Sequence, residues 1–305
     1  MRAPLCIVLC TALAVLSGRA VAAPSQPPEA KPFEEPPHHR LKWRSEWRRF
    51  DALEYVISGA VAAGYLYVEF GVKSPTEPNW TGPILFDDGV RSALRGESRK
   101  ARENAATLSD VFAVTPQVMV FADTILVPTL TDDFNLDVAW QMTAMNLQAL
   151  SFVGLLTRSG HRFVARERPD VAECEKDPDY DPTCFGGSNA SFPGGHSSAT
   201  MTSAGLICAH HLNVPLYGGG APDIAACGTA VGLGLATGWM RMTADRHYAS
   251  DIIVGTVLGF GGGFGLPLLL HYRGLAPTRQ VAGTTITVFP QASERELGLG
   301  LYGWF

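Results

Sequence analysis

The 305-residue sequence carries few charges for its length and no excess of basic residues. Charged residues make up 17% of the chain, hydrophobic residues 46%, and the formal net charge is −5. A protein that binds nucleic acid needs clustered Lys and Arg to neutralise phosphates, and no basic stripe with interleaved aromatic residues occurs here. The composition therefore excludes a nucleic-acid partner.

The sequence also lacks cysteines with CxxC spacing, so it predicts no structural zinc site. Four cysteines follow the N-terminal region: Cys174, Cys184, Cys208 and Cys227. The first two bracket a polar loop, and we predict a local disulfide between Cys174 and Cys184. The other two lie in or beside apolar segments, where a disulfide and buried free thiols are equally plausible.

The first residues predict a signal peptide over residues 1–22. Arg2 supplies a positive start, residues 4–16 are apolar, and Ala20-Val21-Ala22 is a small-residue cleavage pattern. An uncleaved anchor helix is the alternative, but the apolar run is short for a membrane span. We therefore expect an exported protein of the periplasm or cell envelope, a compartment in which disulfides form.

Residues 23–50 predict a linker followed by a basic segment. Residues 24–38 are rich in Pro, Glu and Ala, which is typical of a disordered linker. Residues 39–50, HRLKWRSEWRRF, are basic and aromatic. They predict the start of a solvated amphipathic helix, and contact with a membrane surface is the second interpretation.

Residues 51–275 predict one helical domain. Strand-like alternation is rare in this region, there is no internal repeat, and two long polar loops, 73–108 and 158–196, interrupt the apolar sequence. Asp110 and Asp251 stand at the beginnings of apolar segments, as is typical of helix N-termini. The sequence predicts an all-α bundle of six helices over 52–72, 109–130, 136–157, 197–212, 222–240 and 250–271.

Residues 276–305 differ from the rest and predict a C-terminal β-hairpin. Its strands are TTITVF over residues 284–289 and LGLGLYGWF over residues 297–305, joined through PQASERE. Two strands cannot close a barrel, so we expect the hairpin to pack on the helices.

Three short motifs occur in order, at residues 161–169, 191–196 and 241–251. Their residues suit a phosphate group, because arginine forks match pairs of phosphate oxygens and Arg168 and Arg241 supply two such forks. Gly194 and Gly195 allow backbone N–H groups to approach an oxyanion, next to the N-terminus of the following helix.

The same motifs contain candidates for acid and nucleophile. His196 can protonate a leaving oxygen. His247 and Asp251 are four residues apart and share one face if that segment is helical, so that the carboxylate fixes the imidazole tautomer. Each motif alone has a structural explanation as a turn, a cap or a surface pair. Their conjunction predicts a phosphate-transfer site.

The conjunction resembles the type 2 phosphatidic acid phosphatases, which are relatives of bacterial class A acid phosphatases and vanadium-dependent haloperoxidases. Their pattern is K-x6-R-P, then P-S-G-H, then S-R-x5-H-x3-D, and the resemblance covers about residues 105–272. The matching positions are Arg168, Pro169, Pro193, Gly195, His196, Arg241, His247 and Asp251.

The resemblance implies a role for each of these side chains. His247 attacks phosphorus, Asp251 orients it, and His196 donates a proton to the leaving group. Arg168 and Arg241 hold the phosphate together with Gly194, Gly195 and His161, and no metal or cofactor is needed. The implied fold is the all-α bundle of the acid phosphatase and haloperoxidase type, with the site at its helix ends.

Three positions depart from the family pattern. His161 stands in place of lysine, Gly194 in place of the serine of P-S-G-H, and Met240 in place of the serine before Arg241. The loss of one preorganised hydrogen-bond donor to the reacting group commonly lowers the catalytic rate by roughly 10²–10³-fold. The departures predict an enzyme that is weak or tuned to another substrate.

We expect a metal-independent phosphohydrolase that acts on a phosphomonoester or on a lipid phosphate or diphosphate, with contact to a membrane surface as a further expectation. One alternative is a haloperoxidase that binds vanadate in the same pocket. The other is a non-catalytic envelope protein that retains the fold.

Overall fold

The computed structural model describes residues 39–304 except 183, 185–188, 274–284 and 294–295, and of residues 285–304 it describes only the backbone. The described residues belong to one compact unit of the chain, His38–Phe305. The predicted signal peptide and the predicted linker up to residue 38 lie outside the described residues, as do residues 276–284 of the predicted hairpin region.

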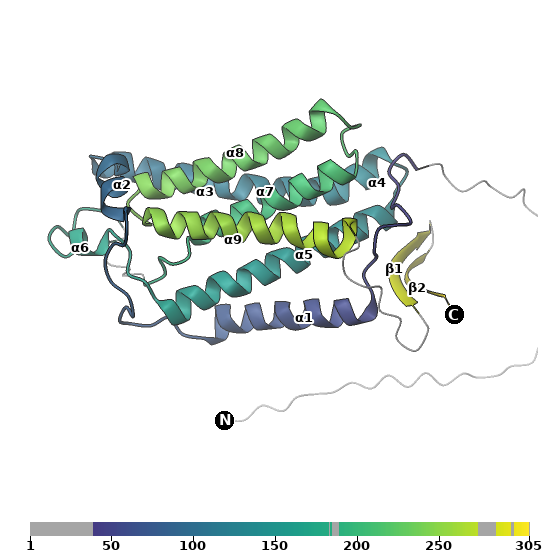
Figure 1. The fold of residues 1–305 in the computed structure, drawn as a ribbon, viewed down its shortest axis with the longest axis horizontal. Coiled ribbons are helices and arrows are strands. Elements are labelled where there is room, and N and C mark those ends of the chain that lie inside the picture. The colour runs from purple at the N-terminus through teal and green to yellow at the C-terminus, as the bar shows by residue number, and fades with distance from the viewer. Residues whose placement is uncertain (1–38, 183, 185–188, 274–284, 294–295, 305) are drawn as a thin grey trace, which may run out of the picture. The chain divides into compact units, whose positions relative to one another are not determined.

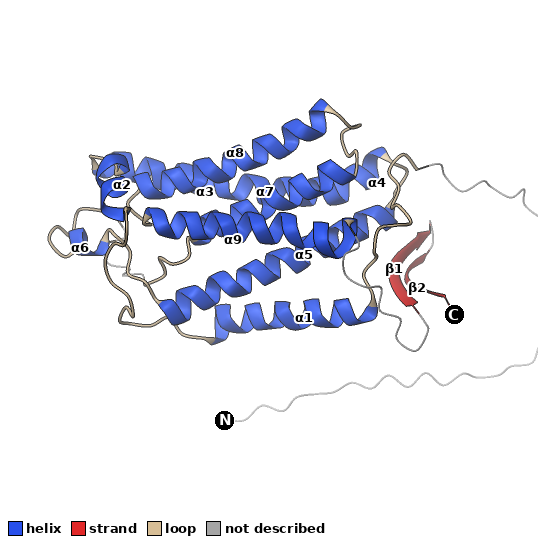
Figure 2. Ribbon diagram, in the orientation of Figure 1, coloured by secondary structure: helices blue, strands red, loops and turns tan. Residues whose placement is uncertain are grey.

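Long helices make up most of the described chain and lie side by side (Figures 1 and 2). The helical content confirms the predicted all-α class of the bundle. The helices of 15 residues or more are α1 (Ala52–Leu66), α3 (Arg99–Phe121), α5 (Leu136–Ser159), α7 (Gly195–Asn213), α8 (Ala221–Thr243) and α9 (Ala249–Pro267).

Shorter helices supplement these six, so the predicted count of six is not confirmed. They are α2 (Asp87–Leu94), α4 (Val127–Thr131) and α6 (Val171–Cys174). The prediction of a loop over 73–108 was wrong, because α2 and nearly the first three turns of α3 lie there. The start of α3 is rich in charged residues, so no apolar run marks this part of the helix in the sequence. Asp110 consequently lies inside α3 and not at its beginning.

Side-chain caps define where several of the helices begin. The side chains of Asp51, Ser98 and Asn135 each accept a hydrogen bond from a backbone N–H three residues further on, at the starts of α1, α3 and α5. Such caps satisfy one of the N–H groups that have no partner inside the helix. The α3 cap explains why the helix begins at Arg99, well before its apolar stretch.

Helix α7 is the centre of the bundle and packs against α3, α5, α8 and α9. Its contact with α9 is a contact between backbones, because glycines leave no side chain between the two helices. A Cβ atom at Gly259 would lie 2.4 Å from the carbonyl oxygen of Ser198, and one at Gly263 would lie 2.0 Å from that of Thr202. This close approach fixes the start of α7 relative to the start of α9.

Substitution of these glycines tests the packing. Gly259→Ala should lower the free energy of unfolding by roughly 1–3 kcal/mol, because the added methyl group forces the two backbones apart. Gly261→Ala is the matched control, since a Cβ at Gly261 meets nothing within 4 Å. It should stabilise the helix by about 0.5–1 kcal/mol. Denaturant unfolding of both variants measures the difference, and equal effects would contradict the packing argument.

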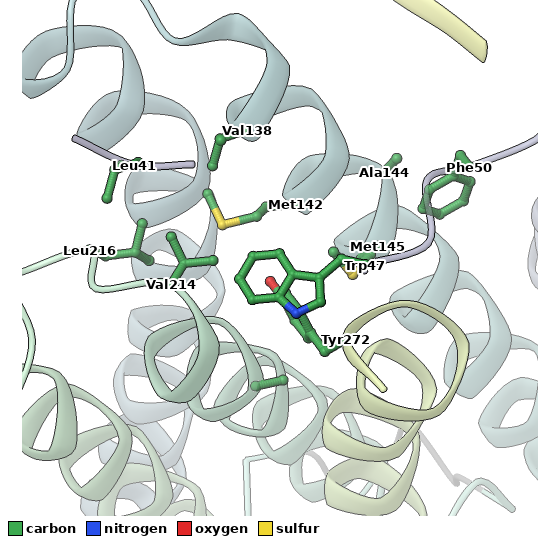
Figure 3. Close-up of a cluster of buried hydrophobic side chains, with 11 residues drawn as sticks. Leu41, Trp47, Phe50, Val138, Met142, Ala144, Met145, Val214, Leu216 and Tyr272 are labelled. Atoms are coloured by element: carbon green, nitrogen blue, oxygen red, sulfur yellow. The ribbon is translucent and has the colours of Figure 1, made fainter. Parts of the chain in front are cut away.

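The basic segment 39–50 contributes to the hydrophobic core instead of forming a solvated helix. Its residues adopt no helix, and Leu41, Trp47 and Phe50 are buried. The ring of Trp47 lies edge-on to that of Tyr272 at a centroid distance of 4.9 Å, in the cluster drawn in Figure 3. Both predictions for this segment assumed that its aromatic residues are exposed. Trp47 and Phe50 are buried and Trp43 is half-buried against the same cluster, so these rings are packed on the bundle and do not form the predicted exposed face.

Two disulfides join segments of the described chain. The predicted bridge between Cys174 and Cys184 is present, with a Cα–Cα distance of 5.2 Å. Cys208 and Cys227, for which the sequence left two possibilities, also form a disulfide, and it links α7 to α8.

A buried ion cluster ties the same two helices to the π-helical turn that follows α3 (Ala122–Leu126), at the end of α7 remote from His196. The Nδ1 atom of His211 lies 2.6 Å from Asp223 Oδ1, and its Nε2 atom lies 3.2 Å from Asp123 Oδ2. Burial alone lowers the pKa of His211, but the hydrogen bonds to the two carboxylates outweigh it and leave this pKa raised. Because carboxylates only accept, both ring nitrogens carry a proton.

Removal of this imidazolium should destabilise the bundle in a pH-dependent way. The pKa of His211 is raised in the folded protein. The contribution of its charge to the free energy of unfolding is therefore complete below the ordinary value of 6.5, and it is lost as the pH rises through the folded pKa. We expect His211→Ala to lower the free energy of unfolding by roughly 3–5 kcal/mol in acid, and by less at alkaline pH. The control is Leu212→Ala, at an exposed neighbouring position. A loss independent of pH would disprove the charge argument.

Strands β1 (Thr285–Ser293) and β2 (Glu296–Trp304) pair antiparallel, with Thr285 opposite Trp304 and Ser293 opposite Glu296. The expected packing of this hairpin on the helices stays a prediction.

Candidate active site

The three sequence motifs meet at one end of the bundle, where α7 and α9 begin and α5 and α8 end (Figure 1). A cavity of about 1150 Å³ opens there. The residues predicted from the sequence that line it are His161, Arg168, Gly195, His196, Arg241 and His247.

Helix α7 presents its N-terminus to the cavity. Gly195 is its first residue and His196 its second, and both line the cavity wall. The first N–H groups of a helix have no partner within it and carry a partial positive charge. This end of α7 therefore suits an anion.

Two arginines add full positive charges. The guanidinium of Arg168 makes no hydrogen bond and no ion pair with any residue in the described ranges, and its Nε atom is buried. Arg241 Nη1 lies 3.3 Å from Ser109 Oγ and 3.5 Å from Asp110 Oδ1. Burial, reinforced by the charge of Arg168, lowers the pKa of Arg241 to about 10. Two adjacent cations with incomplete compensation favour an anionic ligand.

His247 stands in the short loop before α9 with its tautomer fixed. Its Nδ1 atom lies 2.9 Å from the carbonyl oxygen of Ser191, which can only accept, so Nδ1 carries the proton. Burial, together with the charges of Arg168 and Arg241, holds the pKa of His247 well below its ordinary value. The ring is therefore neutral, and Nε2 keeps the lone pair of a nucleophile.

Asp251 does not contact His247 directly, contrary to the prediction from their spacing. Helix α9 begins at Ala249, so His247 precedes it, and the distance from His247 Nδ1 to Asp251 Oδ2 is 4.0 Å. Asp251 instead accepts hydrogen bonds from Ser191 Oγ at 2.7 Å and from the backbone N–H of Tyr248 at 3.0 Å. It therefore orients His247 through Ser191, whose carbonyl group holds the imidazole.

Arg166 holds Asp251 and was not predicted as a site residue. It is fully buried and pairs with Asp251 Oδ1 at 2.6 Å and with Asp87 Oδ2 at 2.8 Å. The rings of Trp80 and Tyr248 lie 4.0 and 4.2 Å from its guanidinium carbon. The partners lie about 80 residues away in the sequence, so no local pattern marks this arginine.

The sequence model of the PAP2 superfamily matches residues 140–275. This match defines the PAP2 segment of the chain, which is somewhat less than half of the 305 residues. No curated protein and no solved structure matches the chain at a significant level. The PAP2 segment contains all the site residues predicted from the sequence, whereas Asp87 and Asp110 lie before it. Members of the superfamily are in general hydrolases of the phosphatase type that act on phosphorylated lipids or small molecules.

Within the PAP2 segment, His161 supports the loop before α7. Its Nε2 atom donates to the carbonyl oxygen of Pro193 at 2.8 Å. Burial, aided by the charge of Arg158, lowers the pKa of His161 to about 4, so the ring is neutral. The predicted phosphate contact would need this nitrogen, which is already engaged. His161 therefore brings no positive charge to the position where the family has lysine.

Gly194 also faces away from the cavity, contrary to its predicted phosphate contact. Its N–H donates to the carbonyl oxygen of Asp251 at 2.9 Å, and a Cβ there would lie 3.2 Å from the same oxygen. Gly195, by contrast, lines the cavity, and its phosphate contact stays a prediction.

The rim of the PAP2 cavity contains a further arginine that the sequence did not single out. Arg246 pairs with Asp170 at 3.2 Å and with Asp181, which lies in the loop closed by Cys174 and Cys184. Its charge is thereby compensated, unlike that of Arg168. No group of three or more His, Cys, Asp or Glu residues within the described ranges could hold a metal ion. Independence from metal stays a prediction.

The pair of Asp87 and Asp88 allows a direct test of the Arg166 cluster. Burial alone raises the pKa of Asp87, but the hydrogen bond from Arg166 and two backbone N–H groups leave it lowered. The contribution of the Asp87 carboxylate to the free energy of unfolding is therefore present above the ordinary value of 3.8, and it is lost as the pH falls through the folded pKa. Asp87→Asn should lower the free energy of unfolding by roughly 3–5 kcal/mol at neutral pH.

Asp88→Asn is the control, because Asp88 is the exposed next residue of α2. It should change stability by no more than about 0.5 kcal/mol. Similar unfolding curves for the two variants would show that the Arg166 cluster does not stabilise this end of the bundle.

Proposed function

We propose that this protein is a phosphohydrolase that works through a phosphohistidine on His247. The observation that carries the proposal is the guanidinium of Arg168, which has no hydrogen-bond or ion-pair partner among the described residues and lines the same cavity as His247, whose Nε2 is unprotonated. A phosphoryl group bound there is both neutralised and exposed to a nucleophile.

The proposed reaction has two steps. Arg168, Arg241 and the N-terminus of α7 bind the phosphate oxygens. Nε2 of His247 attacks phosphorus, the bond to the leaving oxygen breaks, and His196 gives that oxygen a proton. Water then attacks the phosphohistidine, and His196 takes a proton from it as the P–N bond breaks. Phosphate leaves, and His247 and His196 return to their starting states.

The ionisation of His196 fits this role when substrate is bound. In the free cavity its pKa is lowered to about 4, chiefly by burial and by the charge of Arg241, with Asp110 opposing the fall. A bound phosphate carries two negative charges beside the same ring. These charges offset the arginines and raise the pKa of His196, so the substrate itself helps to supply the acid.

A lipid phosphate is the substrate class that we favour. The cavity shares Val114 and Gln117 with an apolar hollow of about 590 Å³ that continues along α3. Val111, Val114 and Val118 are each more than half exposed on this helix. An acyl or isoprenyl chain lying there would bury apolar surface that otherwise faces water.

The helices around the site also suit contact with a membrane. Two stretches, Arg99–Thr131 and Ala249–Tyr272, are long and apolar enough to cross one by length and composition alone. Their most apolar windows are only 33% and 28% buried inside the bundle. Together with the two disulfides, this supports an envelope protein that meets its substrate at a lipid surface.

Phosphate release with chelator present tests the proposal. The substrates are p-nitrophenyl phosphate, glycerol 3-phosphate, phosphatidic acid and an isoprenyl diphosphate. We expect His247→Ala to lower turnover by at least about 10³-fold, because the nucleophile is lost. His39→Ala should have no effect, since His39 contacts Asp132 outside the cavity.

The comparison of phosphatidic acid with glycerol 3-phosphate isolates the lipid chains, because the two share a glycerol phosphate. Faster turnover of phosphatidic acid supports the lipid assignment. A folded protein that releases no phosphate from any of the four substrates would disprove the hydrolase proposal.

A further inference from the structure

We propose that Asp110 is the positioning residue of the general acid His196, and that the two side chains act as a carboxylate–imidazole dyad. The inference rests on the proposed phosphohydrolase function and deepens it. It brings α3, which precedes the PAP2 segment, into the reaction.

The contact between the two side chains determines which ring nitrogen is free. Asp110 Oδ1 lies 2.9 Å from His196 Nε2, and a carboxylate can only accept, so Nε2 carries a proton. Nδ1 makes no hydrogen bond with a residue in the described part of the chain. It is therefore the nitrogen that exchanges a proton with the substrate. This arrangement, with one nitrogen held by a carboxylate and the other free to react, is the logic of hydrolase triads.

The proton balance follows from this geometry. When Nε2 of His247 forms a bond to phosphorus, the leaving oxygen takes the proton of His196 Nδ1–H. When water attacks the phosphohistidine, its proton returns to Nδ1. Nε2 of His196 keeps its proton, hydrogen-bonded to Asp110, through both steps.

Asp110 is also the acidic group that opposes the arginines around His196. The charged and titratable groups that face the ring are Arg241 of α8, Arg168 of the loop after α5, His247 before α9, and Asp110. The two arginines disfavour an imidazolium, whereas the carboxylate favours it. Asp110 therefore makes the protonated acid accessible in a cavity that is otherwise built for anions.

The location of Asp110 argues against a mainly structural role. Its side chain is 61% exposed, so its ion pairs with His196 and Arg241 contribute little to stability. It lies on the face of α3 that forms the cavity wall, together with Thr107 and Val114, at the spacing of successive helical turns. An exposed carboxylate at this point faces the substrate pocket and not the core.

Leaving-group dependence separates the proposed role from a binding role. p-Nitrophenolate leaves readily without a proton, whereas the alkoxide of an alkyl phosphate does not. Asp110→Asn should therefore lower kcat on an alkyl phosphate by roughly 10²-fold and on p-nitrophenyl phosphate by less than about tenfold. His196→Ala should show the same pattern, and the double variant should lose no more than His196→Ala alone.

The pH profile gives a second readout. Because Asp110 raises the pKa of His196, its loss should move the alkaline limb of kcat for the alkyl phosphate to lower pH. Asp110→Glu, which keeps the carboxylate, should recover part of the rate. Asp137→Asn is the matched control, because Asp137 is an exposed carboxylate that pairs with Arg49 outside the cavity. It should leave both substrates unaffected.

The outcomes distinguish the inference from the function on which it rests. If the wild-type protein is active and Asp110→Asn loses kcat equally on the alkyl phosphate and on p-nitrophenyl phosphate, the dyad is overturned. Asp110 would then act in phosphate binding through Arg241. No loss on either substrate would overturn it as well. Absence of turnover in the wild-type protein, or full activity in His247→Ala, would overturn the phosphohydrolase proposal and the dyad with it.

Discussion

The guanidinium of Arg166 lies fully buried between Asp87 of α2 and Asp251 of α9, and it contacts the rings of Trp80 and Tyr248. Breaking a buried ion pair from one side leaves an uncompensated charge, which is far more costly than losing an exposed pair. The cluster therefore locks the start of α9 to the segment that carries Ser191. Because Ser191 holds His247 through its carbonyl group, the position of the proposed nucleophile depends on a buried charge that does not line the cavity.

In the Arg166 cluster carboxylates compensate the guanidinium, whereas the cavity carries an excess of positive charge. Arg166 is matched by two carboxylates and Arg246 by two others, whereas Arg168 has no partner in the described part of the chain. Ion pairing thus separates two kinds of arginine. Arg166 and Arg246 stabilise the structure through carboxylates, whereas the unpaired guanidinium of Arg168 suits an anionic ligand. The close contact of α7 with α9 completes the site, because it brings the positive end of α7 and His196 to the loop that carries His247.

The departures from the family pattern have physical explanations in the structure. His161 stands where the family has lysine, and its Nε2 atom donates a hydrogen bond to the carbonyl oxygen of Pro193. It therefore supports the loop before α7 but adds no positive charge to the cavity. Gly194 replaces serine at a point where a Cβ would lie 3.2 Å from the carbonyl oxygen of Asp251. In the proposed phosphate site, Arg168, Arg241 and the end of α7 therefore remain as the groups that would bind the anion.

The sequence determined the all-α class, the approximate positions of the long helices other than α3, the local disulfide and the set of motifs that meet at the cavity. These features depend on local periodicity or on short spacings, which are visible along the chain. The sequence could not reveal that the segment 39–50 is buried, because burial depends on what packs against it. It also could not show that Asp251 acts through Ser191, since that requires knowing where α9 begins.

Only the tertiary structure identified Arg166, Asp87 and Asp110 as parts of the site. Each meets its partners across roughly 80 or more residues of chain, so no spacing rule links them. The arginines of the sequence look alike, and the fold alone decides which of them pair with carboxylates and which, within the described part of the chain, have no such partner. Local chemistry thus specified the reacting groups, and long-range burial and charge pairing decided how they are held.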